Sequence, residues 1–247
     1  MAITTHGGVR NLQHRLALMN SQGSPAPDPT PTVIWEATYP TAISLAATNT
    51  ATVNLPTANV GDIRCVFINT LTLSAGAPTT PAGWTAIPAN YLFGTYNRYI
   101  YLWWRVKESG DPDSFTGTFG PGGSHTYGYV SMHRYSGNNA APVGASGTTH
   151  TTGVGSSTST APSITTTVDG SQVLTFVHAL NLTGGKTIST PSVGDQRSSV
   201  TPASQAPHVL SDQLVSVAGL TVGPTHTVAT TASNSSVSML TVELKPA

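Results

Sequence analysis

Two carboxylates stand close together in a segment rich in glycine and proline. Asp111 and Asp113 are two positions apart within residues 109–114, a spacing that suits a calcium loop or a pair of acid and base groups. The same composition is also that of an ordinary β-turn. We favour the turn, and ion binding by the two aspartates stays open at this point.

Histidine and cysteine offer little further chemistry. The eight histidines include no pair at the H-x3-H spacing of a zinc site, and Cys65 has no second cysteine to join it. Cys65 alternates with Ile63 and Phe67, which predicts a buried structural thiol. The sequence has no nucleophile elbow, phosphate-binding loop or zinc-protease motif. We therefore expect no catalytic residues, no metal and no cofactor, with a polysaccharide hydrolase as a minor alternative.

The aromatic residues are concentrated in the first half of the chain, because Phe176 alone lies beyond residue 135. Two strand-like runs carry a row of large polar-tipped side chains on one face. These rows are Tyr99, Tyr101, Trp103 and Arg105, and Tyr127, Tyr129, His133 and Tyr135. Such faces are buried in protein interfaces or stack on sugar rings. We favour cover by the chain itself or a sister subunit, with a partner protein or a host glycan as alternatives.

The elements that position these residues begin with an N-terminal arm, residues 1–32. Val9, Leu12, Leu16 and Met19 recur at helical spacing and predict a short helix over 9–22 with one apolar stripe. A segment with alternating prolines follows and predicts an extended spacer. A helix this short needs a surface to lie on. The arm is therefore a candidate for docking, either on its own sandwich or on a larger assembly.

From about Val33 the pattern is β throughout, which predicts an all-β antiparallel sandwich over 33–247. The expected strands lie near 33–38, 50–55, 62–69, 97–107, 114–119 and 126–135, and near 162–167, 172–180, 207–217, 224–230 and 236–244. The small-residue segment 136–162 is expected to cross between two halves, about 33–137 and 158–247.

The two halves repeat the same landmarks at an offset of about 109 residues. Phe67 in an apolar strand recurs as Phe176, and Gly110 recurs as Gly219. Asp62 beside Gly61 and Asp169 beside Gly170 also match, which predicts a shared turn rather than a catalytic group. Matching Val130–Met132 to Val237–Met239 gives a slightly shorter offset, so the register of the last strand is open to a slip of one residue. A duplicated β-unit is typical of a scaffold.

Composition limits the partners. The formal net charge is zero, and 8% of residues are charged against about 25% in ordinary domains. We therefore expect no nucleic-acid partner and no membrane-binding surface. The sequence shows no secretory signal pattern and no apolar stretch long enough for a membrane span.

The succession of turns and strands resembles a known class of structural proteins. The matching segments are 60–62, 80–85, 104–106, 110–112, 115–119, 135–137, 161–167, 210–213, 218–219 and 244–247. Over about residues 33 to 247 the chain is similar to jelly-roll-like β-sandwich proteins of tailed bacteriophage virions, such as head decorations, spikes, fibres and tail appendages. The resemblance implies a non-enzymatic virion protein that is assembled in the host cytoplasm, binds capsid or tail subunits and forms a homo-oligomer. We expect a capsid-attached decoration or spike docked through the arm, with a carbohydrate-binding or receptor-binding tail appendage as the alternative.

Overall fold

The computed structural model describes residues 32–41, 50–55, 57–72, 78–93, 96–118, 125–152, 157–181, 186–200, 207–230 and 235–247. The chain divides between Thr30 and Pro31, and the described residues belong to the unit Pro31–Ala247. The helix predicted over 9–22, with Val9, Leu12, Leu16 and Met19, lies outside the described residues.

The first half builds one five-stranded antiparallel sheet with the order β1-β7-β3-β5-β4. Its strands are β1 (Ile34–Thr41), β3 (Ile63–Thr72), β4 (Thr85–Phe93), β5 (Tyr96–Val106) and β7 (His125–Ser136). An outer pair is formed by β2 (Thr50–Asn54) and β6 (Ser114–Thr118). We call the five-stranded sheet the first sheet.

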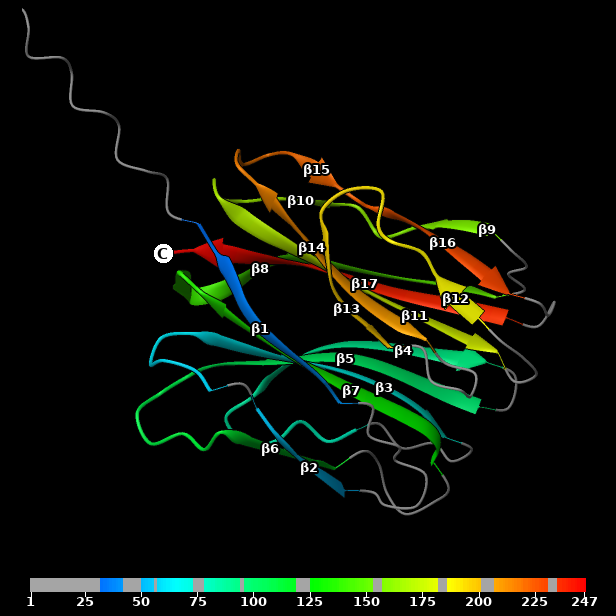
Figure 1. The fold of residues 1–247 in the computed structure, drawn as a ribbon, viewed down its shortest axis with the longest axis horizontal. Coiled ribbons are helices and arrows are strands. Elements are labelled where there is room, and N and C mark those ends of the chain that lie inside the picture. Colours follow the sequence, from blue (N-terminus) through cyan, green and yellow to red (C-terminus); the bar gives the residue numbers. More distant parts are fainter. Residues whose placement is uncertain are drawn as a thin grey trace, which may run out of the picture. The chain divides into compact units, whose positions relative to one another are not determined.

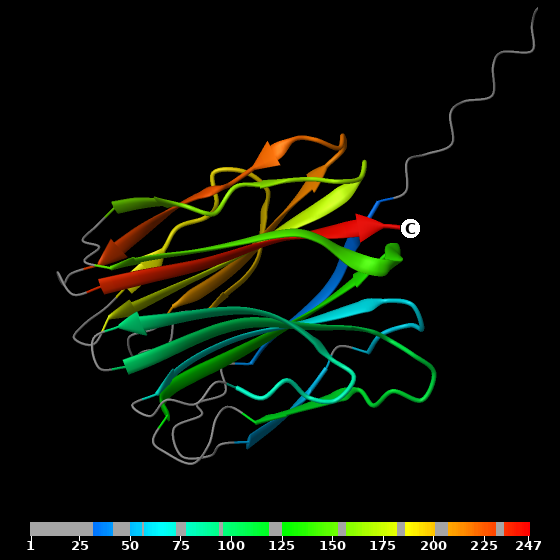
Figure 2. The same cartoon turned by 180° about the vertical axis from the view of Figure 1, so that it is seen from behind.

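The second half builds another five-stranded antiparallel sheet, the second sheet, with the order β13-β14-β11-β17-β8. Its strands are β8 (Asn138–Thr152), β11 (Ser171–Asn181), β13 (Asp195–Val200), β14 (His208–Val215) and β17 (Ser235–Pro246). Short outer strands complete this half: β9 (Ser157–Thr160), β10 (Ile164–Thr165), β12 (Lys186–Ile188), β15 (Thr221–Val222) and β16 (Thr225–Thr230). Figure 1 shows the two sheets as separate layers, and Figure 2 shows them from behind.

The strand orders confirm the duplication. Reading the second sheet from β8 gives β8-β17-β11-β14-β13, which matches β1-β7-β3-β5-β4 strand for strand. The central strands β3 and β11 correspond at an offset of 109 residues, since each carries a stacked phenylalanine, Phe67 or Phe176, at the same place. Each sheet is therefore made from one continuous half of the chain.

Strand pairing also settles the register of the last strand. Phe67 pairs with Ser131 in β7, and Phe176 pairs with Leu240 in β17, so this strand also keeps the offset of 109 residues. The match of Val130 to Val237 is therefore wrong by two residues, which leaves the faces unchanged. The suspected one-residue slip does not occur.

The sandwich interior lies between the two sheets. Phe67, Cys65 and Leu102 of the first sheet pack in one cluster with Phe176 and Leu240 of the second. Cys65 is buried there, as predicted, and burial raises the pKa of its thiol. A second cluster covers the outer face of the first sheet, beneath β2 and β6. Both faces of the central strand β3 are therefore buried, and its apolar residues point to both faces.

Several strand predictions need correction, and the short outer strands β9, β12 and β15 were not expected either. The segment 136–162, expected as a crossover, contains β8, which forms an edge of the second sheet and pairs with β17. An edge strand needs little bulk, and threonine suits it. The strands β4 and β13 were not expected because β4 contains Pro88 and β13 is polar. Proline is tolerated at a sheet edge, where both of these strands lie.

The predicted shared turn is confirmed. Gly61 and Gly170 adopt φ values of 94° and 74° at equivalent places before β3 and β11. These left-handed conformations favour glycine. Among the described residues, no helix has the length and apolarity to cross a membrane.

Candidate functional site

The aromatic row of β5 is covered by the chain itself. Tyr99, Tyr101 and Trp103 are all at most 7% exposed, and they pack with Val53 and Phe115 of the outer pair β2–β6. The rings of Trp103 and Phe115 lie 5.3 Å apart. The alternative of a glycan face is therefore wrong for the three β5 aromatics, because two other strands of this half already cover them.

The remaining members of the predicted face do not form one surface. His133 and Tyr135 are buried between the two sheets, while Arg105 belongs to an ion-pair cluster on the outer side. Tyr127 and Tyr129 lie in β7, and their side chains lie outside the described part of the structure.

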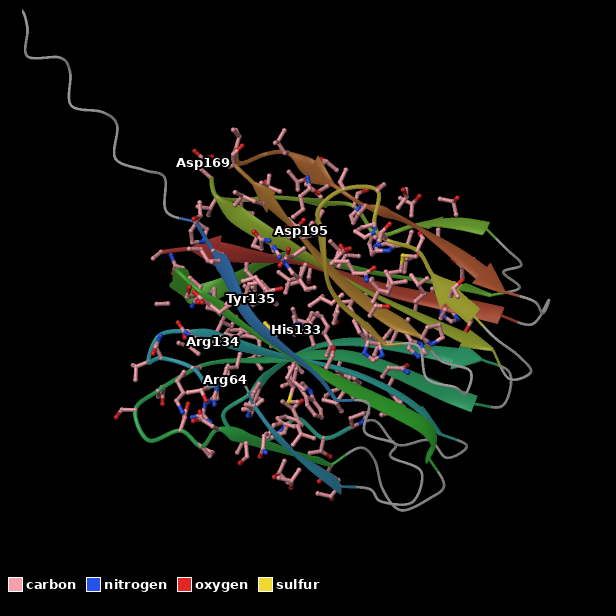
Figure 3. The ribbon with its side chains drawn as sticks, viewed as in Figure 1. Arg64, His133, Arg134, Tyr135, Asp169 and Asp195 are labelled. Atoms are coloured by element: carbon pink, nitrogen blue, oxygen red, sulfur yellow. The ribbon has the colours of Figure 1, made fainter. Side chains whose placement is uncertain are left out.

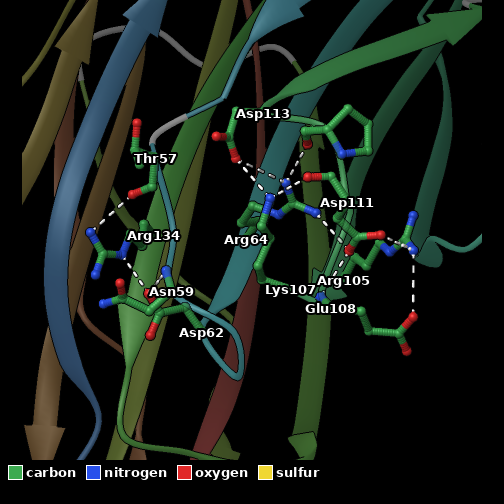
Figure 4. Close-up of polar contacts among 11 residues, drawn as sticks. Thr57, Asn59, Asp62, Arg64, Arg105, Lys107, Glu108, Asp111, Asp113 and Arg134 are labelled. Atoms are coloured by element: carbon green, nitrogen blue, oxygen red, sulfur yellow. Dashed lines mark hydrogen bonds and ion pairs between the residues drawn. The ribbon is translucent and has the colours of Figure 1, made fainter.

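The ion-pair cluster surrounds the loop after β5 (Figure 4). Asp111 accepts hydrogen bonds from Arg64 at 3.1 Å and from Arg105 at 2.5 Å, and Lys107 pairs with Asp113 at 2.9 Å. The turn favoured from the sequence is present, with Gly110 at a φ of 85°. The side chains of Arg64, Arg105 and Lys107 thus pair with the two carboxylates, and this arrangement does not support calcium binding at the loop. In the described residues, no group of three or more His, Cys, Asp or Glu side chains could hold a metal.

A second polar group shows how the halves diverge. Arg134 pairs with Asp62 at 2.6 Å and donates to the carbonyl of Thr57 (Figure 4). At the equivalent position of β17 stands Glu243, whose carboxylate accepts hydrogen bonds from the backbone and hydroxyl of Thr167, the hydroxyl of Ser171 and the backbone of Ala145.

Both versions of this group are structural. Burial alone would raise the pKa of Glu243, but the hydrogen bonds to its carboxylate outweigh burial and hold the pKa below its usual range. Because Arg134 and Glu243 are each held by fixed protein partners, we do not assign either residue a catalytic role.

Histidines line part of the sandwich interior. His133, His178 and His208 are buried, and the His133 and His208 rings contact Phe67 and Phe176 at 5.8 and 5.6 Å. Burial, with a contribution from His208, lowers the pKa of His133 to about 3, and burial lowers that of His208 to about 4. These two imidazoles are therefore neutral near neutral pH.

The strongest candidate site is a cavity of about 430 Å³ where β1, an edge of the first sheet, meets β13, an edge of the second. Aromatic and apolar side chains contribute to its lining together with several polar ones. The lining residues used below are Ile34, Trp35, Gln172, Asp195, Arg197, Asp212 and Leu214. Figure 3 labels Asp195 and the nearby Tyr135.

Arg197 is the centre of the polar network in this cavity. Its Nε donates to Asp212 at 2.7 Å, and its Nη2 lies 3.0 Å from the carboxylate of Asp195. Its guanidinium also lies over the ring of Trp35, 4.7 Å from the centroid. The arginine is thus fixed on three sides.

Asp212 anchors the network from within the core. Its side chain is 0% exposed, and its second oxygen accepts a hydrogen bond from Tyr135 at 3.1 Å. Burial raises the pKa of Asp212, and Arg197, Tyr135 and Gln172 oppose that rise. Burial and the Asp212 carboxylate likewise raise the pKa of Tyr135. Since both carboxylate oxygens are engaged, Asp212 positions Arg197 and is not placed to transfer a proton to a ligand.

The sequence prediction missed this site. Trp35, Arg197 and Asp212 come from strands far apart in the sequence, and the short polar strand β13 carries no apolar pattern. One signal was present: Asp212 is a carboxylate in the strand-like run 208–215, which is buried from His208 to Asp212. A buried carboxylate in such a run requires a partner.

Comparisons with protein-family models, with characterised proteins and with solved structures found no match to this chain.

Proposed function

We propose that the chain is a non-enzymatic structural protein of a phage-type virion, a capsid-attached decoration or spike docked through its N-terminal arm, residues 1–32. The observation that carries this proposal is the duplicated scaffold, in which each half forms its own five-stranded sheet and both sheets share one core. Such a body presents a rigid platform without the need for a disulfide or a metal.

The distribution of charge supports a structural role. The ion pairs of Arg64, Arg105 and Lys107 with the loop carboxylates bind parts of the same half together. The buried carboxylate of Glu243 does the same in the second half. These charged groups therefore stabilise the fold, which supports the proposed structural role.

The jelly-roll-like part of the expectation fits each half taken separately. The chain goes from β1 in the large sheet to β2 in the outer pair and back to β3, and later from β5 to β6 and back to β7. Passing repeatedly between two sheets is a feature of jelly rolls. We therefore propose two jelly-roll-like units whose large sheets face each other.

The arm carries the docking part of the proposal. Its predicted helix has one apolar stripe, Val9, Leu12, Leu16 and Met19, which is suited to a groove on a capsid subunit or a sister subunit. The proline-rich spacer would separate the docked helix from the sandwich, and symmetric copies of the chain would occupy repeated sites of the particle lattice.

Deletion of residues 1–30 tests this function, because the cut lies at the boundary before Pro31. The truncated protein should unfold at the same temperature as the full chain. It should be missing from virus particles purified from the cells that carry the gene, as measured by mass spectrometry. A matched variant, Leu12→Asp with Leu16→Asp, should behave like the deletion. Full-length protein that is absent from particles would refute the virion role, and truncated protein that is incorporated normally would refute the docking role of the arm.

A further inference from the structure

The cavity between β1 and β13 has an internal point of comparison, because the duplication places the same strand positions at a second location. We define the β1–β13 site by six residues: Trp35, Tyr135, Gln172, Asp195, Arg197 and Asp212. The equivalent location lies where β8 and β4, the counterparts of β1 and β13, contact each other. We call it the β4–β8 site.

Strand pairing identifies the counterparts. Asp212 pairs with Asp195, as Trp104 pairs with Thr85. Tyr135 pairs with Trp35, as Leu244 pairs with Val143. The pairing therefore gives five correspondences: Trp35 to Val143, Tyr135 to Leu244, Gln172 to Ile63, Asp195 to Thr85 and Asp212 to Trp104.

The β4–β8 site is mainly apolar. Ile63 and Leu244 are buried in the central core, and Trp104 and Val143 pack against it. Hydrophobic contacts alone are thus enough to stabilise the fold at these four positions. Because a buried ion pair contributes little more than packed apolar residues of similar volume, the scaffold does not require the polar network of the β1–β13 site.

Arg197 has no counterpart at all. The register of β13 with β14 shifts between Gln196 and Ser198, so Arg197 is the extra residue of a β-bulge, whereas β4 pairs with β5 without a shift. Bulges re-aim side chains and are frequent beside functional sites. This bulge directs the guanidinium to both carboxylates and to the ring of Trp35.

The chemistry of the cavity limits its ligand. Two carboxylates face one guanidinium, so the local charge is negative and an anionic ligand would be disfavoured. Asp195 is 72% exposed and offers a hydrogen-bond acceptor, and Arg197 is 23% exposed and offers donors. Trp35 and the exposed Ile34 and Leu214 provide apolar contacts. Planar polar groups beside an aromatic ring suit a molecule with hydroxyl edges and an apolar face.

We propose that the β1–β13 site binds a hexose-sized saccharide, neutral or amino-substituted, with Asp195 and Arg197 hydrogen-bonding its hydroxyls and Trp35 contacting its apolar face. Asp212, Tyr135 and Gln172 are positioning residues that hold Arg197 in place. The cavity volume of about 430 Å³ is within the range of small-molecule sites. This proposal stands independently of the virion role.

The test uses the full-length protein on a glycan array and in calorimetric titrations with glucose, galactose, mannose, glucosamine and glucuronate. We expect at least one neutral or amino sugar to bind and glucuronate not to bind. Asp195→Ala should weaken binding roughly tenfold, since a charge-assisted hydrogen bond is lost. Asp195→Asn keeps the size of the side chain and should also weaken binding.

The matched control is Thr85→Ala, which changes the exposed counterpart of Asp195 in the β4–β8 site. It should leave saccharide affinity unchanged, and thermal unfolding should show that all three variants are folded. The proposal is overturned if no saccharide binds, if glucuronate is preferred, or if both Asp195 variants bind as the wild type does.

Discussion

Phe67 and Phe176 stack with their ring centroids 4.9 Å apart, and each occupies the same position in its own sheet. Beside them, Asn69 donates a hydrogen bond to its own counterpart, His178, at 2.5 Å. Residues that contact their own counterparts lie beside a two-fold axis, as in an isologous interface. The two halves therefore contact each other across such an internal axis at the centre of the core.

Replacing Phe176 by alanine should destabilise the protein by about 3–5 kcal/mol, because the change leaves a cavity between the sheets. Urea unfolding measures the difference. Leu214→Ala is the control, since Leu214 is 50% exposed and its replacement should change the free energy of unfolding by less than about 0.5 kcal/mol. Equal effects of the two changes would contradict the central place of the phenylalanine pair.

Trp103→Ala tests whether the aromatic row of β5 belongs to the core. Trp103 is fully buried beneath β2 and β6, so we expect a loss of about 3–5 kcal/mol in the free energy of unfolding. A variant that keeps wild-type stability while losing binding to a glycan would instead support the glycan alternative weighed in the sequence analysis.

Asp111 and Asp113 should differ sharply in their effect on stability. The Asp111 side chain is 8% exposed and is the nearest carboxylate partner of Arg64 and Arg105. Asp111→Ala leaves the buried Arg64 with Asp113, 3.9 Å away, as its ion-pair partner and should cost about 3 kcal/mol. The Asp113 side chain is 47% exposed, and Asp113→Ala should cost at most about 1 kcal/mol. Thermal unfolding with and without calcium completes the test, because a calcium-dependent rise in Tm would support an ion site instead.

Acid should destabilise the fold through buried histidines. An unfolded histidine titrates near pH about 6.5, whereas burial lowers the pKa of His208 to about 4 and that of His133 to about 3. The unfolded chain therefore binds protons that the folded chain excludes. This contribution to stability is complete above pH about 6.5. As the pH falls, each histidine lowers the free energy of unfolding by about 1.4 kcal/mol per pH unit, until about pH 4 for His208 and about pH 3 for His133.

His208→Gln tests this pH dependence by removing one of the titrating groups. His208 contacts Phe176 of β11 and is electrostatically coupled to His133 of β7. The slope of the unfolding free energy between pH about 6 and about 4.5 should decrease by roughly one histidine's share in urea titrations. An unchanged slope would show that other groups cause the acid sensitivity.

The sequence predicted the all-β antiparallel class, the duplication and the turns at Gly61 and Gly170, since these depend on local residue patterns that repeat. It did not predict β8 or β13, because edge strands with one neighbour need little apolar bulk. The cover of Tyr99 and Trp103 by β2 and β6 also depends on long-range packing, which alternation along one strand does not reveal.

The β1–β13 site could not be predicted for a related reason. Trp35, Tyr135 and Asp212 are brought together by three different strands, and the bulge at Arg197 has no sequence signature that we recognise. Asp212 was the one local indication, because a carboxylate at an inward position must find a donor.

The contiguity of each sheet in the sequence has a further consequence. A single cut near Gly137 would separate the chain into two fragments, each of which contains all five strands of one large sheet. The contact between the sheets is thus equivalent to a dimer interface joined by a peptide bond. Gene duplication and fusion of a self-associating half would produce this arrangement, and fusion would free one copy of each paired site to diverge while the other kept the fold closed.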